Sequence, residues 1–175
     1  MKKILEILLA AGIILCIVSA ASPERNSPKG GGMKLSSPAF ENNGPIPVKY
    51  TGDGADINPP LVIENLPAGT KSLVLIVDDP DAPMGVWLHW LVYDIAPVTK
   101  IAENSIPGTQ GINDFRKKNY GGPYPPSGTH RYFFRLYALD TVLKFPEGQT
   151  RKTVEKAMEG HILGKAELVG TYKRR

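Results

Sequence analysis

The stretch Leu73–Pro83 reads Leu-Val-Leu-Ile-Val-Asp-Asp-Pro-Asp-Ala-Pro and combines an apolar strand with a polar turn. Five apolar residues without polar alternation are typical of a central strand that is covered on both faces. The run Trp90–Tyr93 has the same character. The pattern therefore favours a β-sandwich in which these two strands lie near the centre.

Short apolar segments, separated by turn residues, continue along the chain. Their length and their β-branched or aromatic content predict strands at 34–36, 47–50, 61–64, 72–77, 89–95, 132–139 and 168–172. One helix is expected, with Thr150 as its N-cap, an apolar face that includes Val154 and Met158, and Gly160 at its end. The sequence thus predicts a mainly β domain with one short peripheral helix near the C-terminus.

The first 21 residues have the composition of a signal peptide. Lys2 and Lys3 precede an apolar run over 7–18, and small residues follow it. This run is shorter than the roughly 20 residues that span a bilayer. We therefore expect an exported protein, periplasmic or secreted, with a signal peptide at 1–21, a flexible linker at 22–32 and one domain at 33–175. A membrane anchor formed by an uncleaved N-terminal segment is the alternative.

The only cysteine, Cys16, lies inside the apolar run. Lipidation of Cys16 is a further alternative, although the bulky Leu15 stands where a lipoprotein signal usually has a small residue. Cleavage after Ala20 or Ala21 leaves a mature chain without cysteine, which excludes disulfides, thiolate catalysis and cysteine-based metal sites.

Charge and motifs exclude several other functions. The 175-residue chain has a net charge of +4, and its basic residues are dispersed or terminal, so it lacks the basic stripe of a nucleic-acid-binding protein. It also lacks the phosphate-binding Gly-x-x-x-x-Gly-Lys loop, the Gly-x-Ser-x-Gly motif of hydrolases and the His-Glu-x-x-His motif of zinc proteases. We expect neither a cofactor nor a bound metal.

Two carboxylates, two histidines and a tyrosine form the candidate site. Asp79 and Asp81 lie on the turn after the first central strand, and His89 begins the next strand. Far downstream, His130 and Tyr132 share one face of another strand because side chains alternate along it. If these strand ends lie side by side, imidazole and phenol groups surround a small cavity that suits an anion.

The ligand expected for this cavity carries both charges. Protonated histidines bind a phosphate or carboxylate group, whereas the neighbouring carboxylates repel a bare dianion. A phosphoethanolamine-like head group resolves the conflict, because its ammonium meets Asp79 or Asp81 while its phosphate meets the histidines. Each residue taken singly also has a structural explanation, since Asp-Pro-Asp commonly caps a turn and buried histidines are commonly hydrogen-bonded within the core.

Several motifs resemble those of the phosphatidylethanolamine-binding protein family, and most closely its short bacterial and archaeal branch, the Raf kinase inhibitor-like proteins. They are Asp79-Pro80-Asp81-Ala82-Pro83, Trp87-Leu88-His89, Gly122-Pro123 with Pro125-Pro126, His130-Arg131-Tyr132, and the runs 51–61 and 155–163. The resemblance extends over residues 33–175. It implies two antiparallel sheets with an anion pocket at one end, lined by Asp79, His89, His130 and Tyr132, with the Gly122-Pro123 loop beside it.

The combined interpretation is an exported, non-enzymatic protein that binds a phosphate ester or phospholipid head group and thereby regulates a partner protein. We expect ligand contacts from Asp79, Asp81, His89, Gly122, Pro123, His130 and Tyr132. Membrane contact is expected only through a head group or the N-terminal segment. Two other functions stay open: a protease or kinase inhibitor that acts through the proline-rich rim at 120–128, and a metal-dependent enzyme, because two histidines and a carboxylate form the facial triad of non-haem iron sites.

Overall fold

The computed structural model describes residues 32–174. The elements of this range are, in order, β1 (Lys34–Ser36), β2 (Gly44–Pro45), the 3-10 helix η1 (Val48–Tyr50), β3 (Leu61–Glu64), β4 (Ser72–Asp79), β5 (Trp87–Ile95), β6 (Lys100–Ile101), β7 (Thr109–Gln110), β8 (Thr129–Leu139), α1 (Arg151–Met158) and β9 (Ile162–Lys173). The predicted signal peptide, Cys16 and nearly all of the predicted linker lie outside the described residues. Neither helix of the described range has the length and hydrophobicity of a membrane span.

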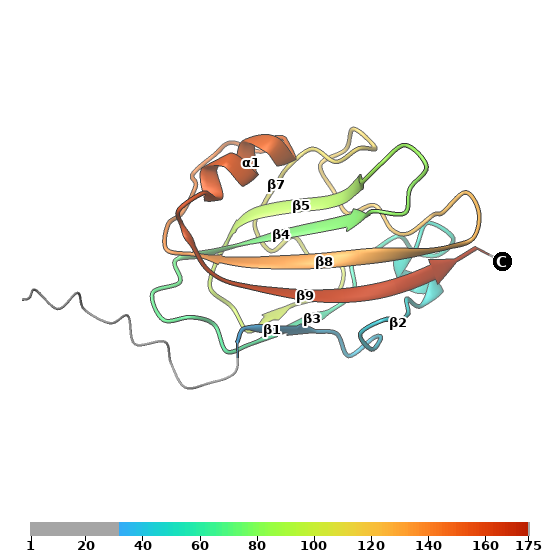
Figure 1. Cartoon of the computed structure of the whole chain (residues 1–175), viewed down its shortest axis with the longest axis horizontal. Helices are drawn as coiled ribbons and strands as arrows, with labels where there is room; N and C mark the ends of the chain where they lie inside the picture. The colour runs from blue at the N-terminus through green and yellow to red at the C-terminus, as the bar shows by residue number, and fades with distance from the viewer. Residues whose placement is uncertain (1–31, 175) are drawn as a thin grey trace, which may run out of the picture.

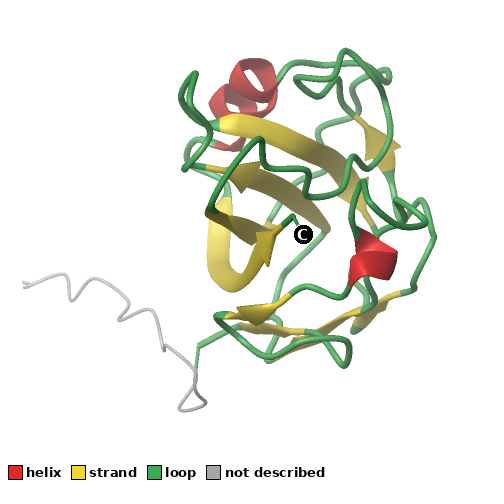
Figure 2. Ribbon diagram, turned by 90° about the vertical axis from the view of Figure 1, so that its right-hand side faces the viewer, coloured by secondary structure: helices red, strands yellow, loops and turns green. Residues whose placement is uncertain are grey.

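The strands form two sheets that lie face to face (Figures 1 and 2). The smaller sheet has the order β1-β3-β6, and the larger has the order β2-β9-β8-β4-β5-β7. Every pairing is antiparallel except that of the two-residue strand β2, which runs parallel to β9. The predicted sandwich with one peripheral helix is confirmed.

Strand β4 lies in the middle of the larger sheet because both of its faces are apolar. Leu73, Leu75 and Val77 belong to the core between the two sheets. Val74 and Ile76 point the other way and pack with buried side chains of α1. All five are at most 1% exposed, as the unbroken apolar run predicts.

Helix α1 begins and ends as its sequence predicts. The Thr150 hydroxyl accepts a hydrogen bond from the Thr153 amide at 3.2 Å and so satisfies one of the free donors of the first turn. Val154 and Met158 are buried against the larger sheet. Gly160, with a φ of +78°, follows the helix in a backbone conformation that glycine adopts without strain.

Residues 47–50 do not form the predicted strand. The 3-10 helix Val48–Tyr50 occupies this segment, with hydrogen bonds from the Tyr50 amide to Pro47 O (2.9 Å) and from the Thr51 amide to Val48 O (3.0 Å). Pro47 has no amide hydrogen to donate to a neighbouring strand. Tyr50 is buried nevertheless, so the apolar pattern identified a core residue and assigned it to the wrong element.

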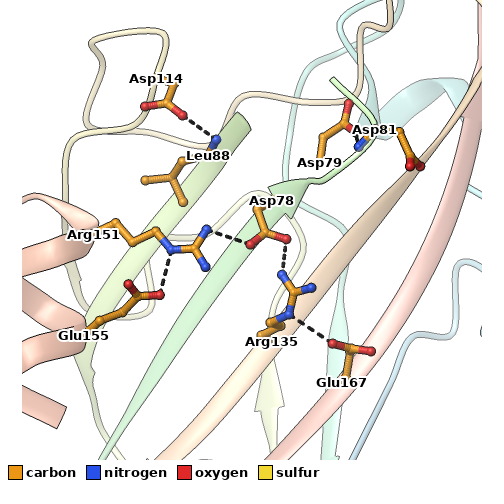
Figure 3. A network of polar contacts seen from close by, with 9 residues as sticks. All are labelled: Asp78, Asp79, Asp81, Leu88, Asp114, Arg135, Arg151, Glu155 and Glu167. Carbon is orange, nitrogen blue, oxygen red and sulfur yellow. Dashed lines mark hydrogen bonds and ion pairs between the residues drawn. The ribbon is translucent and has the colours of Figure 1, made fainter. Parts of the chain in front are cut away.

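A network of ion pairs joins α1 to the end of β4 (Figure 3). Asp78 is 1% exposed and contacts two guanidinium groups, those of Arg135 on β8 and Arg151 on α1, the latter at 2.8 Å. Glu167 and Glu155 accept from the same arginines at 3.0 and 2.7 Å. Because a buried carboxylate needs compensation, this network holds the strand end that carries the candidate site.

Either arginine of this network is expected to compensate the charge of Asp78 when the other is removed. Arg135→Ala or Arg151→Ala alone leaves Asp78 with one cation, so we expect each to lower the free energy of unfolding by about 1 kcal/mol. The double substitution leaves a buried carboxylate without a cation and should cost about 4 kcal/mol, more than the sum. Urea denaturation of the three variants measures this difference, and strictly additive losses would contradict it.

Candidate ligand-binding site

The candidate site lies at one end of the larger sheet, at the right in Figure 1 and toward the viewer in Figure 2. Asp79 is the last residue of β4, and β4 lies between β5, which carries His89, and β8, which carries Tyr132. A register shift between Val77 and Asp78 interrupts the pairing of β4 with β5 at this end. Such bulges turn side chains at strand ends and are frequent beside functional sites.

These strand ends surround a cavity of about 310 Å³. Its polar lining consists of Asp79, His89 and Tyr132. Apolar and aromatic residues complete it: Ala82, Pro83, Met84, Trp87, Phe115, Tyr124, Pro125 and Pro126. A mostly apolar hollow with a few convergent polar groups is typical of a small-molecule site.

Both carboxylate oxygens of Asp79 have hydrogen-bond partners. Oδ2 lies 2.7 Å from Nδ1 of His130, and Oδ1 accepts from the Asp81 amide at 2.8 Å. Asp79 and His130 are 3% and 7% exposed, so their contact is largely desolvated. His130 does not line the cavity; it lies beside Asp79 and orients its carboxylate.

The His89 ring lines the cavity, and one of its two nitrogens is hydrogen-bonded to the backbone. Its Nδ1 lies 2.7 Å from the carbonyl oxygen of Gly121, and since a carbonyl only accepts, Nδ1 carries a hydrogen and Nε2 is left for a ligand. Burial lowers the pKa of His89 and outweighs the opposing effects of this hydrogen bond and of Asp79. The free imidazole is therefore mainly neutral at pH 7.

The Tyr132 hydroxyl is the most informative atom of the site. Tyr132 is 1% exposed, and among the buried side-chain polar atoms of residues 32–174 its hydroxyl oxygen is the one without a hydrogen-bond partner. Burial raises the pKa of this phenol, and the charge and hydrogen-bonding reach of the nearby Asp79 carboxylate raise it further, so the hydroxyl stays protonated. An unpaired buried hydroxyl costs about 1–3 kcal/mol, which a ligand in the cavity would offset.

The comparison with known proteins agrees with the fold and its topology. Residues 36–173 match a family model described as Phosphatidylethanolamine-binding protein. The chain belongs to the phosphatidylethanolamine-binding protein family. A UPF0098 protein of Pyrococcus horikoshii is 47% identical to this family member over 186 residues, which covers 100% of this chain and 91% of the relative. A UPF0098 protein of Methanothermobacter thermautotrophicus is 49% identical over 150 residues, or 81% of this chain and 99% of the relative.

Two solved structures of the same family share this architecture. CT736 of Chlamydia trachomatis, described as a homolog of the family, superposes with a TM-score of 0.81 at 45% identity. Escherichia coli YbcL, described as a member of the mammalian family, gives a TM-score of 0.76 at 26% identity. Each comparison covers 83% of this chain and 100% of the solved chain.

The structure places four of the seven predicted contact residues outside the lining of this cavity. Asp81 is bound by Arg131 through two side-chain hydrogen bonds of 2.9 and 2.7 Å, and these lower the pKa of Asp81 to about 2. His130 stands beside Asp79. The Gly122 amide donates to Asp56 beside a second cavity, and Pro123 O accepts from the Gly52 amide at 3.0 Å.

Metal binding requires several ligands that converge on one point. No group of three His, Cys, Asp or Glu side chains within residues 32–174 is disposed to hold a metal ion. Asp79 Oδ2 and His130 Nδ1 are hydrogen-bonded to each other, and His89 Nδ1 is hydrogen-bonded to the Gly121 carbonyl oxygen. The three side chains of the facial-triad alternative therefore do not converge.

Sequence reasoning missed Phe115, which forms part of the cavity wall. Its ring makes edge contacts with His89 (5.3 Å between centroids) and Trp87 (5.5 Å). Gly121 permits this position, because a Cβ there would lie 2.7 Å from the Phe115 ring. A lone aromatic residue within the polar loop 113–119 is the sequence signal that points to such a role.

Tyr124 also forms part of the cavity wall and is held by Arg174, which follows β9. The Arg174 guanidinium lies 3.8 Å from the centre of the Tyr124 ring and donates to its hydroxyl at 2.7 Å. Asp53 contacts the same guanidinium at 3.4 Å and accepts from the Tyr172 hydroxyl at 2.9 Å. The C-terminal end of β9, which is far from Tyr124 in sequence, therefore fixes part of the cavity wall.

Proposed function

We propose that this chain is an exported, non-enzymatic binding protein whose cavity holds the phosphate group of a phosphate ester or phospholipid head group. The unpaired, buried Tyr132 hydroxyl carries this proposal. It stays protonated and donates one hydrogen bond to an oxyanion in the cavity. His89 Nε2 lies in the same lining and donates a second once the ring is protonated.

Nothing in this role requires a nucleophile or a general base. Asp79 is the carboxylate in the lining. Both of its oxygens have hydrogen-bond partners, His130 and the Asp81 amide, so its role is structural. Neutral phenol, imidazolium and an apolar wall bind an anion without breaking a bond. Calorimetric titration of the mature domain with phosphoethanolamine tests the proposal, with metal content measured on the same sample. Stoichiometric iron would favour the enzyme alternative.

Binding is expected to strengthen in acid. Since burial lowers the pKa of His89, the free ring is neutral at pH 8, and anion binding must bring a proton with it. We expect a phosphodiester such as glycerophosphoethanolamine, which stays monoanionic, to bind about tenfold more tightly at pH 5.5 than at pH 8. His89→Gln should remove this pH dependence. Equal affinity at both pH values in the unsubstituted protein would contradict the role of His89.

The exposed rim of the cavity supports a second candidate function, contact with a partner protein. Met84, Val86 and Tyr124 are 91%, 56% and 49% exposed at or beside the mouth. Methionine and aromatic side chains are enriched in protein interfaces. A partner whose capture survives His89→Gln but fails with Met84→Glu would favour this function. Ile162→Glu, at the far end of β9, is the matched control because Ile162 is 46% exposed.

Export remains part of the proposal, with the signal peptide at 1–21 as the expected leader. Mass spectrometry of the protein recovered from its own cell envelope would give the mature N-terminus. A terminus close to residue 22 would support cleavage, whereas a lipid-modified Cys16 or an intact leader would favour one of the anchored forms.

A further inference from the structure

A third cavity, of about 250 Å³, lies beside β7 at the edge of the larger sheet. It shares no lining residue with the cavity that contains the Tyr132 hydroxyl. Most of its lining is polar and comes from segments far apart in the chain, namely Asp56, Asn58, Asn104, Ser105, Gln110 and Asn119. The function proposed above makes no use of this polar hollow.

A buried amide holds the rim of this cavity in place. Asn58 is 3% exposed, and its side chain accepts from the Ser105 amide at 2.9 Å. It also donates to Ala102 O at 2.9 Å and to Pro59 O at 3.1 Å. The loop 102–105 is thereby tied to a residue 44 and 47 positions away, so the rim is already ordered when a ligand enters.

Gln110 contributes a hydrogen-bond donor of fixed orientation. The indole N–H of Trp90 donates to Gln110 Oε1 at 2.8 Å, which leaves the amide nitrogen Nε2 turned away from the indole. Nε2 has no acceptor among residues 32–174. Asp56, which also borders the second cavity, contributes an acceptor: its Oδ1 is bonded to the Gly122 amide at 2.6 Å, while Oδ2 has no partner within the same range. The third cavity thus offers both a free donor and a free acceptor on anchored side chains.

This lining favours a neutral ligand with several hydroxyl groups. None of the described residues that line the cavity is Lys, Arg or His, so an anion gains no ion pair and is repelled by Asp56. An ammonium group has no lone pair with which to accept from Gln110, and an apolar ligand leaves both side chains unpaired. A hydroxyl donates and accepts, so neighbouring hydroxyls on one ring satisfy Gln110 and Asp56 together. Trp90 and Tyr120, packed edge to face at 5.5 Å, add aromatic surface for the carbon face of such a ring.

We propose that the third cavity binds a neutral sugar, as a pyranose ring whose adjacent hydroxyls bond to Gln110 Nε2 and Asp56 Oδ2. The exposed amides of Asn104 and Asn119 in the lining supply further partners. This site is separate from the phosphate site and does not depend on it. A free hexose and the terminal residue of a glycan offer the same chemistry.

The two tryptophans of the chain make the test specific. Trp90 lines the third cavity and Trp87 the phosphate cavity, so each indole N–H signal reports on one site in a proton–nitrogen NMR spectrum, and Trp87→Phe assigns the two signals. Glucose, galactose, mannose and their methyl glycosides are titrated into the labelled protein. We expect at least one hexose to shift the Trp90 signal saturably, with a Kd of about 1–10 mM, and to leave the Trp87 signal in place. Equal binding of its methyl glycoside identifies the end of a glycan as the ligand, whereas loss of binding identifies the free sugar.

Two substitutions remove hydrogen-bonding groups and keep the backbone as it is. Gln110→Glu retains an oxygen for Trp90 but replaces the Nε2 donor by a second acceptor, so we expect the affinity to fall about tenfold. Asn104→Gly removes an amide at a φ of +49°, which glycine adopts without strain, and should weaken binding about threefold. Asn65→Gly is the matched control and should leave binding unchanged, because Asn65 is exposed, has a φ of +56° and lies outside the cavity.

The uronic acid of the best hexose tests the charge of the ligand. Its carboxylate is repelled by Asp56, so we expect it to bind about tenfold less tightly than the neutral hexose. The inference is wrong if no hexose shifts the Trp90 signal, if Gln110→Glu leaves the affinity unchanged, or if the uronic acid binds as tightly as the hexose. Because Trp87 reports on the phosphate cavity separately, the proposed function stands or falls by its own titration.

Discussion

Replacement of Tyr132 by phenylalanine is expected to stabilise the protein and to weaken phosphate binding. The hydroxyl is buried without a partner, and burying it costs free energy because it loses its hydrogen bonds to water. Its removal eliminates part of this cost, so we expect the free energy of unfolding to rise by about 1 kcal/mol. The same hydroxyl donates to the bound anion, so phosphate affinity should fall about tenfold or more. Urea denaturation and calorimetric titration measure the two effects on one sample.

Tyr93→Phe is the matched control for this prediction. The Tyr93 hydroxyl donates to Pro146 O at 2.7 Å, and its ring is buried in the core between the larger sheet and α1. Its loss should cost about 1 kcal/mol and leave phosphate affinity unchanged. If Tyr132→Phe destabilises as much as Tyr93→Phe does, the Tyr132 hydroxyl has a structural partner in solution and the proposed function loses its main support.

His130→Ala is expected to be among the most destabilising single changes at the site. It leaves the Asp79 carboxylate, 3% exposed, with only the Asp81 amide as a partner, and we expect a loss of about 3 kcal/mol. Thermal or urea unfolding at pH 7 measures this loss. In an Asp79→Asn background the same substitution should cost much less, because no buried charge is then left uncompensated.

His161→Ala tests whether the stability lost with a histidine–carboxylate pair depends on the burial of that pair. His161 lies 2.8 Å from Asp140 in the same Nδ1 to carboxylate arrangement, but both side chains are 47% exposed. Its loss should change the free energy of unfolding by less than about 0.5 kcal/mol. Equal losses for the buried and the exposed pair would show that His130 does not compensate Asp79.

Local pattern was sufficient for most of the fold. The unbroken apolar runs that became β4 and β5 specify strands buried on two faces, because water-avoiding side chains on both sides of a strand require two covering layers. The failure at 47–50 has the same origin: apolar residues indicate burial, but Pro47 lacks the amide donor that a paired strand needs.

The candidate site was predicted less completely than the fold. Alternation along β8 correctly put Tyr132 and His130 on one face, yet only Tyr132 reaches the cavity lining, because His130 is drawn to Asp79. Whether a carboxylate faces a ligand or a neighbouring cation depends on contacts between residues far apart in the chain. Arg131 reaches Asp81 across 50 positions, and Asp56 reaches Gly122 across 66.

The sequence by itself determined the sandwich, its family and the residues from which a polar site is built. The spacing of buried residues and the residue types of turns depend only on neighbours in the chain, so both can be recognised without the tertiary structure. Tertiary structure alone decided how those residues divide their hydrogen bonds. It paired Asp79 with His130 and Asp81 with Arg131, left the Tyr132 hydroxyl unpaired, and set the Asp56 carboxylate beside a second cavity. Such partnerships follow from distances of a few ångströms between distant segments, and only the packed sheets fix those distances.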